Sequence, residues 1–268
     1  MHSGARGKAG GIVLCKSDEE VKDASEKLFG TYLKTIQTGD EGKLIEKPVM
    51  REMYRIVSIA KKLGIPADYP RLKGLNSRYS KITVVERKAT DKGPSFGEQF
   101  HTDSIYTKKP PRFTMLLSKL VPRKGQANTE FSSQYLAYKN LPHNIKKKLK
   151  NLKAIYSSEG PISVTLQERT KEKGKQKNEL ISKHKIIKKI NKKLSIFCSP
   201  GHFIGFKNIN KKEETKLKKF LFKHQVKKKF QYSLEWEKDQ LAIWDNRSML
   251  HQATPFKGDR IMHRITIY

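Results

Sequence analysis

Short stretches in which apolar and polar residues alternate are the feature that most limits how this chain can fold. Phe230, Tyr232, Leu234 and Trp236 alternate with polar residues, which is typical of a half-buried β-strand. Hydrophobic patterning also predicts strands over residues 81–86, 113–118, 194–197 and 241–244, and helices over 50–63, 143–152 and 213–227. Many short strands with few helices predict a mainly β domain with flanking helices, a sandwich or a barrel.

The composition is compatible with one large globular domain, since 36% of the 268 residues are hydrophobic and 9% are aromatic. The charge is strongly positive, with 57 Lys and Arg against 26 Asp and Glu and a formal net charge of +31. Such an excess favours anionic partners such as nucleic acid. However, lysine far outnumbers arginine, the residue expected for bidentate phosphate and base recognition. A solvated lysine-rich surface is therefore favoured, and nucleic-acid binding stays open as an alternative.

The two cysteines, Cys15 and Cys198, are too few for a disulfide framework or a zinc cluster, which indicates a reducing compartment. No apolar run approaches the ~20 residues of a membrane span. The first residues lack the apolar core of a signal peptide. We therefore expect a cytoplasmic protein with no membrane partner. A homo-oligomer is compatible with the sequence, which does not determine the oligomeric state.

A histidine and an aspartate stand two residues apart in Phe100–Asp103. If this segment is a strand, His101 and Asp103 project to the same side. With His251 folded back beside them, the set becomes two histidines and one carboxylate, which suits a non-heme Fe(II) oxygenase because other coordination positions stay open. The pattern alone is weak, because a lone histidine is more often a hydrogen-bonded structural residue than a metal ligand.

The C-terminal residues add a second indication. In a strand, Arg260, Met262, Arg264 and Thr266 share one face, while Ile261, His263, Ile265 and Ile267 share the other. Two arginines facing a protein interior are costly without anionic partners. Anionic ligands would explain them, and structural ion pairs are the alternative.

Several separated blocks together resemble the TauD/TfdA family of Fe(II)- and 2-oxoglutarate-dependent dioxygenases over about residues 51–268. The blocks are Phe100–Asp103, Asn128–Ser133, Ser199–Gly201, Leu241–Arg247, His251 and Asp259–Arg264. The resemblance implies a double-stranded β-helix, or jelly roll. It also implies an enzyme that uses Fe(II), 2-oxoglutarate and O2 to hydroxylate a small substrate, with release of succinate and CO2.

The resemblance carries residue roles with it. His101, Asp103 and His251 match the iron ligands, and Thr129 and Arg260 match the residues that bind the distal carboxylate of 2-oxoglutarate. Arg264 matches the position that holds an anionic substrate group, which would be a sulfonate, phosphonate or carboxylate. We expect His202 and His263 to be structural, and the Trp244–Arg247 segment to build the turn that aims His251. Tyr106 and Arg78 are further candidates for lining the site.

The N-terminal segment does not resemble the dioxygenase family. A glycine-rich stretch over residues 4–11 leads into a predicted strand over 12–15 and a helix over 18–29 that begins with a Ser17/Glu20 capping box. Residues 1–47 resemble a fragment of the ATP-grasp domain of succinate- and malate-CoA ligase β-subunits, with Ala5–Gly7 matching a phosphate-contacting segment. Because the rest of that domain is missing, we interpret the segment as a non-functional graft, with a CoA-ligase fragment as the alternative function.

This graft takes the place of the N-terminal strands that usually precede the dioxygenase helix near Met53, so part of the β core is expected to be missing. Residues 167–189 form a basic, polar stretch. We interpret that stretch as a solvated insertion, and a loop over the active site or a nucleic-acid contact are its alternatives.

Overall fold

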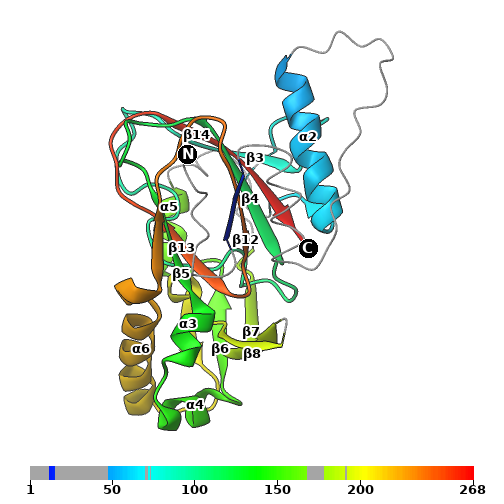
Figure 1. The fold of residues 1–268 in the computed structure, drawn as a ribbon. Coiled ribbons are helices and arrows are strands. Elements are labelled where there is room, and N and C mark those ends of the chain that lie inside the picture. The colour runs from blue at the N-terminus through cyan, green and yellow to red at the C-terminus, as the bar shows by residue number, and fades with distance from the viewer. Residues whose placement is uncertain (1–11, 16–47, 70–71, 73, 168–177, 191) are drawn as a thin grey trace, which may run out of the picture.

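The computed structural model describes residues 12–15, 48–69, 72, 74–167, 178–190 and 192–268. Its larger sheet has six strands paired antiparallel (Figure 1). The order is β1 (Ile12–Cys15), β12 (Leu241–Asp245), β4 (Phe113–Leu120), β14 (Arg260–Ile267) and β2 (Pro66–Ala67), and β3 (Ile82–Arg87) also pairs with β14. The strand predicted at residues 12–15 is confirmed, and it forms an edge of this sheet beside β12.

The two faces of the larger sheet pack against different partners because side chains alternate along its strands. Phe113, Met115 and Leu117 of β4 project toward the long helix α2 (Pro48–Leu63) and join its buried residues in one cluster. Figure 1 shows α2 lying along this side of the sheet. The predicted amphipathic helix is therefore confirmed, and it covers the outer face of the larger sheet.

The opposite face packs against a smaller antiparallel sheet made of β11 (Gln231–Leu234), β5 (Thr129–Ser133) and β13 (Met249–Ala253). Residues of both sheets form one buried cluster, which contains Leu116, Ala242, Trp244 and Met262 from the larger sheet and Phe131, Leu234, Trp236 and Met249 from the smaller sheet or the residues next to it. Two antiparallel sheets enclosing a common core are the predicted sandwich, and the jelly-roll expectation is confirmed by structures compared below.

A third cluster lies in the lower part of the molecule as drawn in Figure 1. Its sheet has the order β10 (Phe203–Phe206), β6 (Lys153–Ser157) and β7 (Ile181–Lys185), and β8 (Ile187–Ile190) and β9 (Lys193–Ile196) form a hairpin. Beside α2, the helices of the described residues are α3 (Gln134–Lys139), α4 (His143–Leu149) and α6 (Lys211–Gln225) in this lower part and α5 (Val164–Gln167) above it. Short 3-10 turns lie at Pro161–Ser163, Pro200–His202 and Lys228–Phe230.

Some predicted elements differ from the structure. The expected strand through His101 is absent, since this residue forms only an isolated bridge. Within the basic stretch expected to be an insertion, residues 181–190 instead form β7 and β8. One side of each strand is exposed and carries charged residues, so the sequence of this segment did not predict strands. The predicted helix over residues 18–29 lies outside the described residues.

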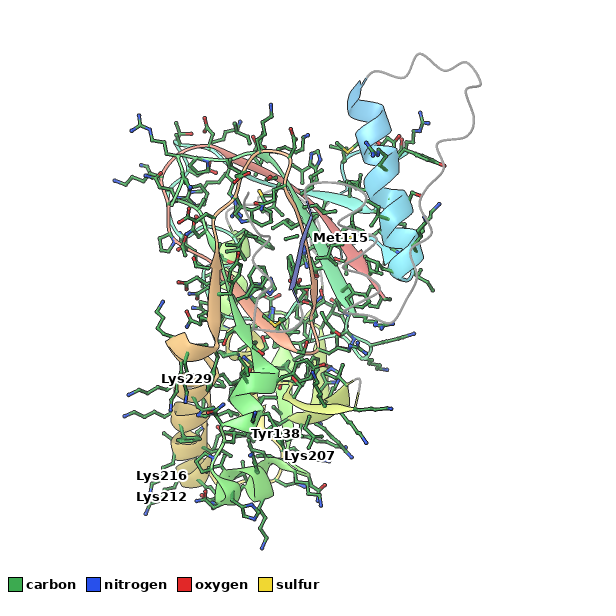
Figure 2. All side chains as sticks on the ribbon, in the orientation of Figure 1. Met115, Tyr138, Lys207, Lys212, Lys216 and Lys229 are labelled. Carbon is green, nitrogen blue, oxygen red and sulfur yellow. The ribbon has the colours of Figure 1, made fainter. Side chains whose placement is uncertain are left out.

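Lysines dominate the surface around α6. Lys207, Lys212, Lys216 and Lys229 are exposed and project outward from this lower part (Figure 2). This arrangement fits the predicted solvated basic surface. Across the described ranges, no helix is both long enough and apolar enough to cross a membrane.

Candidate metal centre

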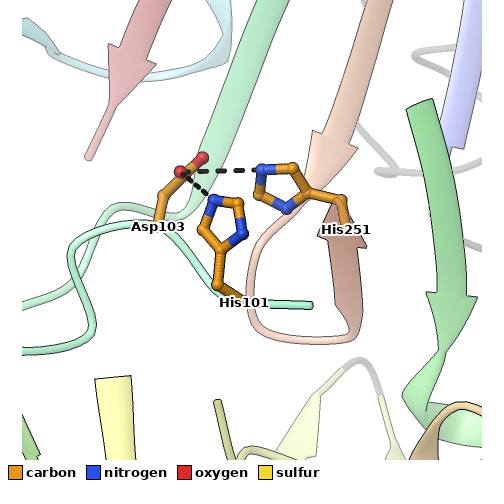
Figure 3. A group of neighbouring side chains, drawn as sticks. All are labelled: His101, Asp103 and His251. Carbon is orange, nitrogen blue, oxygen red and sulfur yellow. Dashed lines mark ion pairs between the residues drawn. The ribbon is translucent and has the colours of Figure 1, made fainter. Parts of the chain in front are cut away.

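His101, Asp103 and His251 come together from two distant parts of the chain. His101 and His251 form an antiparallel bridge in which each backbone N–H donates to the carbonyl of the other at 3.0 Å. Oδ1 of Asp103 lies 3.6 Å from Nε2 of His101 and 3.7 Å from Nε2 of His251 (Figure 3). All three residues are buried, and their ligand atoms lie within 4.8 Å of one another, so the group could hold a metal ion.

The ring of His101 is fixed from two sides. Its Nδ1 lies 2.7 Å from the carbonyl oxygen of Gln99. Because a carbonyl only accepts, Nδ1 donates its proton there, and in the neutral ring this leaves Nε2 with a free lone pair. Gly97 has a φ of +83°, and a Cβ at this position would lie 3.3 Å from Cε1 of His101. Glycine therefore allows both this backbone conformation and the close approach to the imidazole.

His251 is held in its neutral form. Burial and the neighbouring His101 lower the pKa of His251 well below its ordinary value, and the attraction of Asp103 does not offset them. A neutral imidazole is the form that binds metals. The turn before β13 is held by the backbone N–H of Arg247, which donates to Oδ1 of Asp245 at 2.9 Å, and by Nη2 of Arg247, which donates to Oδ2 of Asp245 at 2.6 Å. The ring of Trp244, just before this turn, lies 4.7 Å from that of His251. That the Trp244–Arg247 segment aims His251 stays a prediction.

Asp103 has a partner at each carboxylate oxygen. The hydroxyl of Thr114 donates to Oδ2 at 2.6 Å, and Nη2 of Arg264 lies 2.8 Å from Oδ1. Burial by itself would raise the pKa of Asp103, but the Arg264 guanidinium and the two histidines outweigh it and hold this pKa well below its ordinary value. Asp103 is therefore a carboxylate at neutral pH, the form that binds a cation.

Arg264 is buried among tyrosines. Its Cζ lies 4.2 Å from the ring centroid of Tyr69, and Tyr106 and Tyr268 also interact with it electrostatically. Burial would lower the pKa of Arg264, but Asp103 and Tyr69 outweigh burial and raise it. Neither Nη1 nor Nη2 of Arg264 makes a hydrogen bond among the described residues, although Nη2 forms an ion pair with Asp103. An anionic group could satisfy Nη1, because a buried donor without a partner is unfavourable.

Thr129 and Arg260 lie on the two sheets that enclose the core. Thr129 pairs with Ala253 across β5 and β13, while Phe131 pairs with His251. Paired residues, and residues two apart on one strand, share a face, so Thr129 projects from the face that carries His251. Arg260 is buried at the start of β14, with its Cζ 5.7 Å from the ring centroid of Phe256. It shares a face of β14 with Arg264.

Four residues that the sequence did not single out for the site contact the predicted site residues: Gly97, Thr114, Tyr69 and Trp236. A polar Thr114 between apolar Phe113 and Met115 was a usable signal, since it points a hydroxyl at the opposite face. Tyr69 and Gly97 gave no such signal. Of the earlier candidates, Tyr106 is buried beside His202, with ring centroids 4.9 Å apart. Arg78 is exposed and lies over Tyr79.

The chemistry of this donor set is restrictive. Two imidazoles and one carboxylate on one side of a metal leave the remaining coordination positions open, which is typical of non-heme Fe(II) oxygenases. The residues present therefore fit a bound Fe(II) ion.

Solved structures with a similar fold include dioxygenases. A putative α-ketoglutarate-dependent taurine dioxygenase from Burkholderia xenovorans aligns with a TM-score of 0.65 and 19% identity, covering 80% of this chain and 71% of that one. The protein AAD-2, solved in complex with Mn(II) and N-oxalylglycine, aligns with a TM-score of 0.67 and 16% identity, covering 94% of this chain and 90% of that one. These likenesses confirm the predicted jelly-roll fold.

The N-terminal resemblance is confirmed at sequence level. Residues 1–63 match an ATP-grasp domain model. The probable malate–CoA ligase β-subunit of Mesorhizobium japonicum is 52% identical over 65 residues, and the succinate–CoA ligase β-subunit of Exiguobacterium sibiricum is 52% identical over 52 residues. The chain spans 16% and 14% of the length of these two proteins.

The second family match covers most of the chain. Residues 51–266 match the model of the taurine catabolism dioxygenase TauD, TfdA family. This match includes every predicted site residue and agrees with the buried His-Asp-His group. The protein therefore belongs to the TauD/TfdA family, whose members are dioxygenases that use Fe(II), 2-oxoglutarate and O2.

Proposed function

We propose that this dioxygenase hydroxylates a small anionic substrate, with conversion of 2-oxoglutarate to succinate and CO2. The observation that carries the proposal is the buried convergence of two imidazole Nε2 atoms and Oδ1 of Asp103 beside a guanidinium with an unused donor, Nη1 of Arg264. The first group fits a metal, and the second fits a negatively charged group next to it.

In this proposal His101, Asp103 and His251 hold Fe(II). When bound, the iron supplies activation of O2 coupled to oxidative decarboxylation of 2-oxoglutarate. Thr129 and Arg260 bind the distal carboxylate of 2-oxoglutarate, through a hydroxyl donor and a planar guanidinium that can make two charge-assisted bonds. Phe131 and Trp244 pack against the ring of His251 and exclude water from that side of the site.

Arg264 sets the substrate class. Its Nη2 forms an ion pair with Asp103, and neither Nη1 nor Nη2 makes a hydrogen bond among the described residues. A sulfonate, phosphonate or carboxylate would satisfy Nη1 and add negative charge beside a residue whose burial is unfavourable without it. A cation at the same place would be repelled by the guanidinium, so a trimethylammonium compound without an acidic group should not be a substrate.

Turnover of 2-oxoglutarate tests the enzyme class. Anaerobic protein with Fe(II) and 2-oxoglutarate should give a visible charge-transfer band, and admission of air should release succinate. His101→Ala should abolish both signals. Replacement of the exposed His143 by alanine is the matched control and should leave both unchanged. A protein that gives neither signal would contradict the proposal.

A substrate panel tests the anionic specificity. Sulfonates, phosphonates, carboxylates and betaines are compared by the increase in succinate over the uncoupled baseline. We expect increases with members of the acidic classes, and Arg264→Gln should raise the KM for them more than it lowers baseline succinate. If a trimethylammonium compound without an acidic group increases succinate release, and does so equally in Arg264→Gln, the assigned role of Arg264 is excluded.

The exposed lysines around α6 favour a second candidate, a basic nucleic-acid-binding protein on an inactive oxygenase scaffold. Salt-dependent binding to arbitrary duplexes without any 2-oxoglutarate turnover would support it. For the N-terminal segment we propose a non-functional graft, because the chain spans only a small part of the ligases it matches. Calorimetry showing micromolar affinity for Mg-ATP would overturn that interpretation and favour a CoA-ligase fragment.

A further inference from the structure

Trp236 makes a single directed contact with a proposed cosubstrate residue. Its indole Nε1 donates to Oγ1 of Thr129 at 2.9 Å. Both side chains are buried, and they meet although 107 positions separate them in sequence. The contact follows from strand pairing, because Leu234 of β11 pairs with Thr129 of β5 and the chain continues from there to Trp236.

This contact determines what the Thr129 hydroxyl can do. A hydroxyl has one donor and two acceptor positions, whereas an indole N–H is only a donor. Trp236 therefore occupies an acceptor position and leaves the Thr129 proton free. In the part of the chain that the structure describes, no group accepts that proton. It is available to a ligand.

The indole also limits where the proton can point. The Thr129 proton must avoid the indole N–H, and a threonine hydroxyl without such a neighbour can rotate to a nearby backbone carbonyl instead. A hydroxyl that accepts a hydrogen bond is in addition polarised and becomes a stronger donor. Both effects favour donation from Thr129 to a carboxylate that lies on the free side of its oxygen.

We propose that Trp236 is a positioning residue for 2-oxoglutarate, and that it acts by orienting and polarising the Thr129 hydroxyl toward the distal carboxylate. The inference rests on the proposed role of Thr129. It requires that the effect of Trp236 depends on that hydroxyl and appears only with ligands that carry the distal carboxylate.

Calorimetric binding to the full-length protein loaded with Mn(II), which does not turn over, tests this requirement. The ligands are 2-oxoglutarate and pyruvate, which has the same 2-oxo acid group but no distal carboxylate. Trp236→Phe keeps an aromatic ring and removes the N–H. We expect it to weaken 2-oxoglutarate about 5-fold, as for loss of one hydrogen bond, and to leave pyruvate unchanged.

Thr129→Val and the double variant complete a cycle. Thr129→Val should weaken 2-oxoglutarate selectively, and adding Trp236→Phe to it should have no further effect. Trp244→Phe is the matched control, since it removes the indole N–H that Trp244 donates to Asn246 in the same buried cluster. It should shift both ligands alike.

Three results would overturn the proposal: an unchanged ratio of the two affinities in Trp236→Phe, additive losses in the double variant, or Thr129→Val without selective loss. The first two leave the proposed function intact, whereas the third, or absence of 2-oxoglutarate binding altogether, rejects the cosubstrate site itself. If Trp236→Phe does not fold, Trp244→Phe leaves Trp236 as the sole tryptophan of the two in the chain. Its fluorescence should then change with 2-oxoglutarate and not with pyruvate, and equal responses would overturn the proposal.

Discussion

Replacing Arg264 by leucine removes the cation that lies 2.8 Å from the buried carboxylate oxygen Oδ1 of Asp103. Both side chains are almost fully buried, with relative exposures of 4% for Arg264 and 3% for Asp103, so water cannot take over the lost interaction. Breaking a buried ion pair by removing one partner typically destabilises a protein by about 3–5 kcal/mol. We expect a loss of this size in the free energy of unfolding of metal-free Arg264→Leu.

The same geometry predicts that a bound metal reduces the stability difference between wild type and Arg264→Leu. Oδ1 is also the oxygen that faces Nε2 of His101 and of His251, so Arg264 and a bound divalent cation neutralise one and the same atom. Removing Arg264 takes away a positive charge next to the metal position. Arg264→Leu should therefore bind Mn(II) more tightly, and saturating Mn(II) should recover at least about 1.4 kcal/mol of the loss, a factor of ten in metal affinity.

Urea unfolding with EDTA and with Mn(II) measures both quantities. Arg264→Lys, which keeps the charge but loses the guanidinium fork, should fall between wild type and Arg264→Leu. In metal-free protein, Asp103→Asn combined with Arg264→Leu should be more stable than the sum of the single losses predicts. Additive losses, or a metal-free Arg264→Leu within about 0.5 kcal/mol of wild type, would refute the reasoning, since such values are usual for surface substitutions.

Three further predictions concern other parts of the molecule. Gly97→Ala should lower stability by about 1–2 kcal/mol through its positive φ and weaken Mn(II) binding roughly tenfold by displacing the His101 ring, as measured by unfolding and calorimetry. Burial and the repulsion of Arg247 lower the pKa of Lys188 to about 8, so the unfolded chain binds more protons between pH 8 and 10.5 and stability should rise with pH there. Lys188→Met should flatten that rise and add about 1–2 kcal/mol to the free energy of unfolding at pH 7, after a discount for partial exposure. Urea unfolding at pH 7, 8 and 10.5 measures both effects. Deleting Ile12–Cys15 should uncover the edge of β12 and give a lower Tm and a larger species in size-exclusion chromatography, whereas an unchanged Tm would exclude a stabilising role for β1.

Alternation along strands allowed much of the dioxygenase domain to be predicted. The faces of β4 and β14 follow directly from residue order, and α2 follows from its helical spacing. Strands such as β5, β6 and β13 were not predicted, because they are short and mix small polar residues with apolar ones. They are stabilised by pairing with strands far away in sequence, and this pairing cannot be predicted from the local sequence pattern.

In the site, too, some features were predicted from the sequence and others depend on contacts between distant residues. Alternation in β14 predicted that Arg264 faces the interior and needs an anion, and the structure supplies that anion from the protein itself, as Asp103. Sequence could not identify it, because the contact depends on the turn at Asp103, and this segment was expected to be a strand. The consequence for function is specific. Since Nη2 already lies 2.8 Å from Oδ1 of Asp103 in an ion pair, a substrate anion bound through Nη1 would share the guanidinium with the carboxylate beside the metal position.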